Sequence, residues 1–469
     1  MSLWTNITAA EATGGKAQGA WEASRVEIDS RRVKPGDLFV ALKGENFDGH
    51  DYVKEALAKG AVAAVVQGSG VRDQGSGLLV VPDTLKALED LGRAARKRTH
   101  AKIVGVTGSV GKTSAKEMLR IALSAHGETY ASSGNFNNHI GAPLNLANLP
   151  VSAKFAVFEM GMNHAGEIAH LTKMVRPDVA VITNVEAVHL EFFESLQGIA
   201  NAKAEIFSGV EKGGVAVLNI DNRFGDYLKM KAQERGLKVV MFGKAGDADG
   251  QVLKYEATAS GCSVRARIGD KEIDYSMRAT GEHWAQLSVM ALIVARSLGL
   301  DPALSARALA EHFEEPEGRG RQVALAGGVT LIDDSYNASP ASMRAAMAKV
   351  ADVWEARGLQ GRKIAALGDM LELGAESAEL HSGLAVDLER HGFDAVFTAG
   401  KLMKHLHDAL PNALRGGHVA GAMELLPVLQ KELRAGDILL VKGSHGSKMH
   451  ELAKALLNKD SAMGKRHAV

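Results

Sequence analysis

The sequence of 469 residues contains little that suits a secreted or membrane-embedded protein. It has one cysteine, Cys262, so it can form neither an internal disulfide nor a cysteine-rich metal site. No run of about 18 apolar residues is present, which argues against a membrane-spanning helix. The first residues also lack the basic and apolar segments of a signal peptide. We therefore expect a cytoplasmic protein without stable membrane insertion.

An excess of charge of either sign is also missing. Lys and Arg number 55, as do Asp and Glu, so the formal net charge is zero. This balance argues against a protein that binds nucleic acid through bulk charge. Hydrophobic residues make up 46% and charged residues 23%, which is ordinary for a globular protein. At roughly 150 residues per domain, the length predicts about three domains.

What the sequence does contain is an alternation of apolar, strand-like runs with helical stretches. Runs this apolar suit a parallel sheet that is covered on both faces. A polar segment at 311–322, with Pro and Gly, separates two such regions. We predict an α/β fold of three domains: 1–100, 101–316 with a central P-loop parallel sheet, and a Rossmann-like domain at 317–469. The predicted strands are Asp37–Leu42, Ala61–Val66, Ile103–Val106, Phe155–Phe158, Val179–Ile182, Val215–Leu218, Lys238–Phe242, Val329–Ile332, Lys363–Leu367, Ala395–Ala399 and Ile438–Val441, and the predicted helices include Tyr52–Lys59, Pro82–Arg98, Leu196–Phe207 and Gly281–Leu298.

The clearest chemical feature is the stretch GVTGSVGKTS at 105–114, between a predicted strand and a predicted helix at 115–125. Glycines let backbone N–H groups approach phosphate oxygens, and the helix N-terminus adds its dipole. The strict pattern G-x-x-x-x-G-K-[ST] fails at one position, which is Val106. The pattern predicts that Lys112 binds the β- and γ-phosphates and that Thr113 offers its hydroxyl to Mg²⁺. The other predicted loop contacts are Thr107, Gly108, Ser109, Val110 and Gly111.

Kinases, GTPases and ATP-driven ligases all contain such a loop, and they differ in the other residues that surround the γ-phosphate. Residues near the ends of later strands are therefore needed to tell these activities apart. Glu159 follows one strand, Asn184 and His189 follow the next, and Lys203 lies on a helix after them. A carboxylate at the C-terminal end of a parallel strand faces the ligand crevice and could hold Mg²⁺. A cationic lysine could bind a metal only after CO₂ converts it to a carbamate. Glu159, His189 and a carbamylated Lys203 would then suit a second ion.

Several stretches, taken in order, resemble the Mur ligase family. They are VTGSVGKTS, SSGNFNNHIGAPLNL at 132–146, FEMGMNHAGEI at 158–168, ITNVEAVHLEFFESLQGIANAKAEIF at 182–207, LIDDSYNASPASMRAA at 331–346 and ALGDMLELG at 366–374. DSRRVKPGDLFVALKGENFDGHDYV at 29–53 resembles the uridine-nucleotide-binding domain of that family. The chain departs from it at Trp284 and Leu287, where asparagines are usual, and at His445, where arginine is common.

The resemblance implies ATP-dependent amide formation between UDP-N-acetylmuramoyl-tripeptide and D-Ala-D-Ala, through an acyl phosphate, in peptidoglycan precursor synthesis. It implies two Mg²⁺ ions, one on Thr113 and Glu159 and one on His189 and carbamylated Lys203. Lys112, Glu159, His189 and Lys203 would be the catalytic residues. The remaining implied contacts are Asn184, Arg319 or Arg321, Asp334, Tyr336 and Asn337 for the nucleotide, and Asp29, Ser30, Arg31, Asn137 and Asn138 for the substrate.

Other activities remain open at this point. A sister ligase that adds the third peptide residue, or a folylpolyglutamate synthase, would share the loop and the metal ligands. A P-loop GTPase or binding module is a different class, but no N-K-x-D motif follows the loop. A kinase would transfer the phosphate to a stable acceptor. We expect a monomer that closes by rotation near 316–322.

Overall fold

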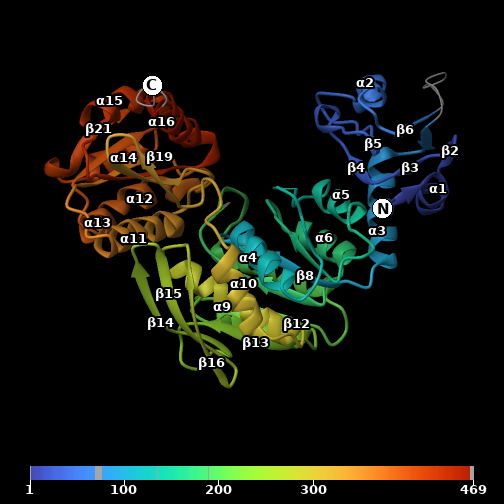
Figure 1. The fold of residues 1–469 in the computed structure, drawn as a ribbon, viewed down its shortest axis with the longest axis horizontal. Helices are drawn as coiled ribbons and strands as arrows, with labels where there is room; N and C mark the ends of the chain where they lie inside the picture. Colours follow the sequence, from blue (N-terminus) through green and yellow to red (C-terminus); the bar gives the residue numbers. More distant parts are fainter. Residues whose placement is uncertain (1, 69–76, 135, 189, 465–469) are drawn as a thin grey trace.

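A computed structural model describes residues 2–68, 77–134, 136–188 and 190–464 of the chain. The main sheets fall in three successive parts of the sequence. Figure 1 shows the first part in blue, the second in cyan to yellow below it, and the third in orange and red on the opposite side. No helix in the described ranges is long and apolar enough to cross a bilayer.

The first part is built on a five-stranded sheet in the order β2-β7-β6-β5-β4. Its strands β4 to β7 pair in parallel, and β2 pairs with β7 in the antiparallel direction. The helix predicted at Tyr52–Lys59 is a 3-10 turn followed by a shorter α-helix, and the glycine-rich loop after β6 falls largely outside the described residues. The elements are β1 (Trp4–Thr5), α1 (Asn6–Thr13), β2 (Lys16–Gln18), β3 (Glu22–Ala23), β4 (Arg25–Glu27), η1 (Ser30–Arg32), β5 (Asp37–Val40), η2 (Gly49–Tyr52), α2 (Val53–Ala58), β6 (Ala63–Gln67), β7 (Leu78–Val81) and α3 (Thr84–Arg98).

The second part is a nine-stranded sheet in the order β16-β15-β14-β13-β12-β11-β8-β10-β9. Strands β8 to β13 are parallel, as their apolar sequences predict. Alternate residues enter two cores: Val104 and Val106 pack with α4, α9 and α10, whereas Ile103 packs with α6, α7 and α8. The elements are β8 (Lys102–Thr107), α4 (Lys112–Ser124), β9 (Thr129–Ala131), α5 (Gly141–Ala147), β10 (Phe155–Glu159), α6 (Glu167–Val175), β11 (Val179–Ile182), η3 (Leu190–Phe192), α7 (Leu196–Ala204), η4 (Glu205–Gly209), β12 (Val215–Asn219), α8 (Gly225–Glu234), β13 (Lys238–Gly243), α9 (Glu282–Ser297) and α10 (Pro302–His312).

An antiparallel extension of this sheet was not predicted from the sequence. It consists of β14 (Gly250–Thr258), β15 (Gly261–Ile268) and β16 (Lys271–Met277), joined by two tight turns. Buried and exposed residues alternate along β15, the period-2 pattern of a half-buried strand. That pattern was present in the sequence, but these runs are less apolar than the parallel strands beside them.

The third part is a six-stranded sheet in the order β17-β18-β22-β19-β20-β21. All its neighbours are parallel except β17, which pairs with β18 in the antiparallel direction and starts inside the segment expected to be a linker. Two cores cover its faces. The elements are β17 (Arg321–Leu325), β18 (Val329–Asp334), α11 (Pro340–Ala356), β19 (Lys363–Gly368), η5 (Gly374–Glu376), α12 (Ser377–Ser382), α13 (Leu384–Arg390), β20 (Ala395–Ala399), α14 (Met403–Ala409), η6 (Asn412–Leu414), β21 (Arg415–Val419), η7 (Ala422–Glu424), α15 (Leu425–Glu432), β22 (Ile438–Lys442), η8 (His445–Ser447) and α16 (Met449–Gly464).

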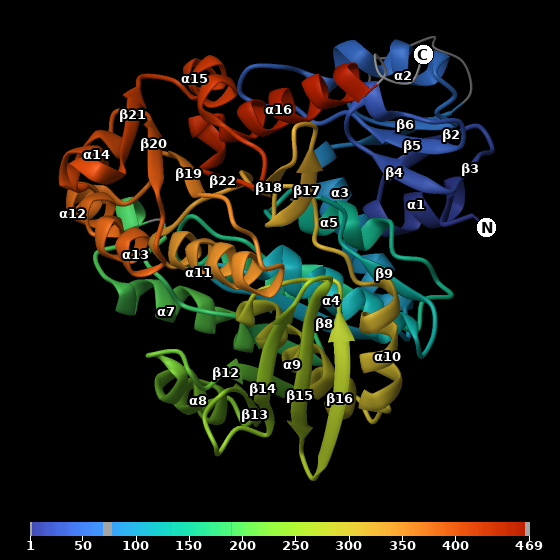
Figure 2. The ribbon, with the colours of Figure 1, turned by 60° about the vertical axis from the view of Figure 1, so that its left-hand side comes forward.

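Contacts join the three parts. Helix α3 packs on α5, and the Asn148 side chain after α5 donates to and accepts from the backbone of Val26 in β4, at 2.9 and 2.8 Å. On the other side, α11 lies next to β14 of the antiparallel extension (Figure 2). The second and third parts therefore meet along a surface that contains both α11 and strand β14 of the antiparallel extension.

Candidate functional site

The glycine-rich loop joins β8, in the middle of the central sheet, to the first turn of α4. The helix begins at Lys112, three residues earlier than predicted, and Gly111 is its N-cap residue, without a side-chain cap. Gly108 and Gly111 have φ angles of 152° and 82°, which disfavour a side chain. A Cβ at Gly108 would also collide with the hydroxyl of Thr183. The two glycines are thus required by the fold of the loop.

The loop is fixed by the segment that follows β11. The Thr183 hydroxyl donates to the carbonyl of Val110 at 2.6 Å, and the Ser109 amide donates to the carbonyl of Asn184 at 2.8 Å. The Ser109 hydroxyl donates to the Glu186 carbonyl and accepts from the Glu186 amide. These bonds hold the loop in one conformation, so its shape is set before any ligand binds.

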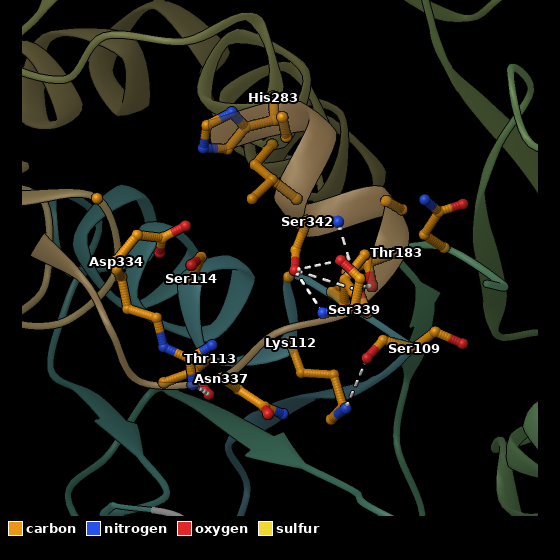
Figure 3. A pocket seen from close by; sticks show the side chains of 18 of the residues that line it. Ser109, Lys112, Thr113, Ser114, Thr183, His283, Asp334, Asn337, Ser339 and Ser342 are labelled. Carbon is orange, nitrogen blue, oxygen red and sulfur yellow. Dashed lines mark hydrogen bonds between the residues drawn. The ribbon is translucent and has the colours of Figure 1, made fainter. Parts of the chain in front are cut away.

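Lys112 lies back across this loop (Figure 3). Its Nζ donates to the carbonyl of Gly108 at 2.8 Å and to that of Ser109 at 3.4 Å. Burial lowers the pKa of Lys112, the negative charge of Glu159 opposes that shift, and the positive charge of Arg319 adds to it. An ammonium held among carbonyls in a buried loop is placed to bind an anion that enters the cavity.

Glu159 is the last residue of β10 and is 3% exposed. One of its oxygens accepts from the Thr113 hydroxyl at 3.0 Å, and the other accepts from the Asn137 amide at 2.8 Å. A buried carboxylate beside a hydroxyl is a set of hard oxygen donors, which fits Mg²⁺. In the described part of the chain, no group of three or more His, Cys, Asp and Glu side chains is placed to hold a metal.

Asn184 lines the same cavity, and both ends of its amide are already bonded. Its Nδ2 donates to Glu186 Oε1 at 3.0 Å, and its Oδ1 accepts from the amide of Asn222. Burial raises the pKa of Glu186, whereas the bond from Asn184 lowers it. The orientation of Asn184 is therefore set by Glu186 and Asn222, neither of which was predicted as a site residue.

Lys203 lies at the end of α7 and is 2% exposed. Burial lowers its pKa well below the usual range, and the positive charge of Lys112 adds to that shift. Among the described residues, none forms an ion pair with its amino group. Carbamate formation needs a neutral amine, because its lone pair attacks the carbon of CO₂, and burial favours this form of Lys203. His189, predicted as a partner of Lys203 on a metal ion, lies outside the described residues.

The third part of the chain completes the cavity, which has a volume of about 370 Å³. Arg319 reaches across to Thr113, where its guanidinium donates to the hydroxyl at 3.4 Å, and it lies 3.9 Å from the ring centre of Tyr336. Lys442 forms an ion pair with Asp334 at 2.6 Å and donates to the Asn337 carbonyl. Figure 3 shows Asp334 and Asn337 around the same space as Lys112 and Thr113.

Some predicted site residues do not reach this cavity. Arg321 is exposed on β17, so of the two hinge arginines only Arg319 lines the cavity. Asn138 accepts from the amides of Ile140 and Gly141 at the start of α5, whereas Asn137 faces Glu159. Asp29 and Arg31 pair with each other at 2.7 Å in the first domain, away from the residues that line the cavity.

The departures from the family pattern also have clear positions. Trp284 is 1% exposed and packs against Phe313, with ring centres 5.1 Å apart, so the indole belongs to the core where that core borders the cavity. Leu287 lines the cavity near Gly111. His283, beside Trp284, has its pKa lowered to about 3 by burial and by the charges of Lys349 and Lys442.

Sequence reasoning missed several lining residues. Thr183, Asn222 and His283 carry polar groups in or beside the cavity, and Lys349 approaches it from α11. Thr183 could have been found, because it precedes Asn184 at the end of a predicted strand. Lys349 could not, because a lysine on a helix is usually solvated.

Comparison with known families accounts for nearly the whole chain. The Mur ligase family catalytic domain matches residues 22–110, the Mur ligase middle domain matches 106–295, and the Mur ligase glutamate ligase domain matches 318–445.

Two curated relatives named UDP-N-acetylmuramoyl-tripeptide–D-alanyl-D-alanine ligase align over most of the chain. The protein of Rickettsia prowazekii (strain Madrid E) is 34% identical and covers 96% of this chain and 99% of its own. That of Escherichia coli (strain K12) is 36% identical and covers 94% and 96%.

Solved structures agree. MurF from Acinetobacter baumannii has a TM-score of 0.84 at 31% identity and covers 97% of this chain and 99% of its own. MurF from Thermotoga maritima in complex with ADP has a TM-score of 0.80 at 27% identity, with coverage of 94% and 98%.

Proposed function

The chain belongs to the Mur ligase family, and we propose that its residues perform the reaction for which its relatives are named. It is a ligase that uses ATP to form a peptide bond. The reaction joins UDP-N-acetylmuramoyl-tripeptide to D-Ala-D-Ala, in the synthesis of peptidoglycan. This conclusion agrees with the resemblance found in the sequence.

The phosphate loop and Arg319 supply the positive charge that phosphoryl transfer needs. The terminal carboxylate of the tripeptide attacks the γ-phosphorus of ATP, which forms an acyl phosphate and releases ADP. The amine of D-Ala-D-Ala then attacks the acyl carbon, and phosphate leaves. Lys112 and the loop amides hold the phosphates, and Arg319 neutralises charge from the opposite wall. No protein nucleophile is required, because catalysis rests on positioning and charge.

Mg²⁺ fits the donor set at the end of β10. Thr113 and Glu159 would hold it with their hydroxyl and carboxylate oxygens. When bound, such an ion neutralises the negative charges of the phosphates and the attacking carboxylate. Asn137 fixes the free oxygen of Glu159, so the carboxylate keeps one orientation.

A second Mg²⁺ is proposed on carbamylated Lys203 and His189. The burial of Lys203 and the absence of a described carboxylate partner support the modification, because both favour a neutral amine. A carbamate on this side chain would add a carboxylate near Lys112, whose charge already acts on the amino group of Lys203. His189 is carried over from the sequence motif alone.

The remaining proposals concern the first domain and the context of the enzyme. Asp29, Ser30 and Arg31, at the start of η1, are proposed to bind the uridine nucleotide of the substrate. Asn184, Asp334, Tyr336 and Asn337 are proposed to contact ATP, which their places around the cavity support. A cytoplasmic location, a monomeric state and closure by rotation near 316–322 remain predictions.

One observation carries the proposed chemistry: residues from two domains, Lys112, Thr113 and Glu159 on one side and Arg319 on the other, surround one cavity. The test is to measure ADP and phosphate release while each reactant is omitted in turn. We expect release only when UDP-muramoyl-tripeptide, D-Ala-D-Ala, ATP and Mg²⁺ are all present.

Other outcomes would overturn the proposal. Release that needs a diamino acid or glutamate instead of D-Ala-D-Ala would indicate a sister ligase or a folylpolyglutamate synthase. Nucleotide hydrolysis that ignores both substrates would indicate a GTPase or a binding module. Transfer of phosphate to a stable product would indicate a kinase.

A further inference from the structure

Helix α11 contacts the central domain at a second place, away from the phosphate loop. Lys349 and Asp352 lie three residues apart on α11 and therefore share one face of the helix. Asp352 Oδ2 accepts a hydrogen bond from the hydroxyl of Tyr255 at 2.8 Å. Lys349 forms an ion pair with Glu315, just before the hinge. Figure 1 shows α11 directly beside β14, the strand that carries Tyr255.

Both of these bridges continue to consecutive backbone amides. Glu315 Oε1 accepts from the amide of Thr280 at 3.0 Å. The Tyr255 hydroxyl accepts from the amide of Gly281 at 2.8 Å while it donates to Asp352. Thr280 and Gly281 immediately precede α9. Two side chains of α11 are thus connected, each through one intermediate side chain, to the start of α9.

The Lys349–Glu315 pair is buried: the two side chains are 2% and 4% exposed. Desolvating two charges offsets much of their attraction, so such a pair adds little to stability but is sensitive to the loss of either partner. Tyr255 also forms hydrogen bonds on both sides of the domain boundary, to Asp352 of α11 and to Gly281 of the central domain. A set of bonds with these properties fixes geometry more than it adds stability.

The two elements that these bridges connect both line the nucleotide cavity. His283 and Leu287 contribute from the first turns of α9, and Ala345 and Lys349 contribute from α11. Glu315 also precedes Arg319 by four residues, so the same ion pair restrains the segment that brings Arg319 to Thr113. A shift of α11 would therefore change both the shape of the cavity and the position of Arg319.

We propose that Lys349 and Asp352 are positioning residues for the ligase reaction, which act through Glu315 and Tyr255 to hold α11 against the start of α9. They set the separation of the cavity walls and the place of Arg319. This assigns a task to the antiparallel extension, since β14 supplies Tyr255. The inference rests on the proposed function in one respect, namely that ATP occupies this cavity.

The test uses Tyr255→Phe in the full-length chain, because this change removes one hydroxyl and leaves the ring in place. The matched control is Tyr275→Phe, which removes a buried hydroxyl that bonds Ser288 at 2.6 Å within the central domain. KM for ATP, KM for the UDP-linked substrate, kcat and thermal stability are measured for both. We expect Tyr255→Phe to raise the ATP KM about tenfold and to leave the UDP-substrate KM within about twofold.

Two further variants keep the test decisive. Asp352→Asn retains an oxygen that can accept from Tyr255, so we expect a near-normal ATP KM, whereas Asp352→Ala should raise it. The double variant Lys349→Met/Glu315→Gln removes both buried charges, which favours folding, yet it should also raise the ATP KM because the bridge to Thr280 weakens.

A purely structural role would give a different result. In that case Tyr255→Phe and Asp352→Ala would lower thermal stability, as Tyr275→Phe does, and neither they nor the double variant would change the ATP KM; this overturns the inference. Failure of the proposed function is distinguished by the unmodified enzyme, which would then form no product in any of these assays.

Discussion

The nucleotide end and the proposed uridine end of this enzyme are built in different ways. At the nucleotide end, Arg319 from one domain bonds Thr113 from another, and buried side chains surround the cavity. At the proposed uridine end, the Arg31 side chain is 83% exposed and pairs with Asp29 inside one domain. The first region is assembled from several segments, whereas the second is a surface. Substitutions in the first should therefore reduce the rate of chemistry, and substitutions in the second should mainly weaken binding.

The largest effect is expected at Lys112. Lys112→Met should reduce kcat on the order of a thousandfold, because the phosphates lose their principal cation in a buried loop. ADP formation with all reactants present measures it. Lys231→Met, at a lysine that pairs with Glu234 on the surface of α8, is the control and should behave like the unmodified enzyme. Comparable activity in the two variants would contradict the assignment of the phosphate loop.

The second-largest effect is expected at Lys203. It tests whether this side chain acts as a carbamate, which is negatively charged, or as a positively charged ammonium. Lys203→Ala should lose activity by about a hundredfold or more, and a short carboxylic acid added to the assay should restore part of it. Removal of CO₂ should slow the unmodified enzyme, and added bicarbonate should reverse the loss. Full activity of Lys203→Ala, or rescue by a short amine instead of an acid, would exclude the carbamate.

A third comparison uses the two hinge arginines. Arg319→Ala should lower kcat/KM for ATP by about a hundredfold, since a charge-assisted contact across the cavity is removed. Arg321→Ala, on the exposed face of β17, should stay within about twofold. Initial rates over a range of ATP concentrations measure both. Equal losses would show that the hinge acts as a whole and that the reach of Arg319 to Thr113 is not decisive.

The smallest effect is expected at the uridine end. Asp29→Ala or Arg31→Ala should raise KM for the UDP-linked substrate about fivefold, with the ATP KM and kcat little changed. Substrate titrations at saturating ATP provide the measurement. If only the ATP kinetics changed, these residues would not belong to the uridine site. The proposed difference between the two ends would then be contradicted.

The sequence predicted those parts of the fold whose signal is local. Every strand with a parallel neighbour in the two larger sheets was predicted except β9, β21 and β14, which pairs in parallel with β13, and the phosphate loop was found because its residues are contiguous. Yet β10, β18 and β22 each extend past the predicted end, to Glu159, Asp334 and Lys442. These polar residues end the apolar run but continue the hydrogen-bonded ladder, and they line the cavity.

The rest could not be predicted because it depends on distant segments meeting. Asn222 orients Asn184 from 38 residues away, and Tyr255 meets Asp352 across 97 residues. Neither pair has a sequence pattern. The roles predicted for His189 and Lys203, and the domain bounds at 100 and 316, remain predictions.

The most direct test of the central claim follows one oxygen atom. UDP-muramoyl-tripeptide labelled with ¹⁸O in its terminal carboxylate is incubated with the enzyme, ATP, Mg²⁺ and D-Ala-D-Ala, and the released phosphate is analysed by mass spectrometry. If the carboxylate attacks the γ-phosphorus, each phosphate carries one ¹⁸O atom from the peptide. Phosphate that contains no label, formed at the same rate as the new peptide bond, would contradict the acyl-phosphate route.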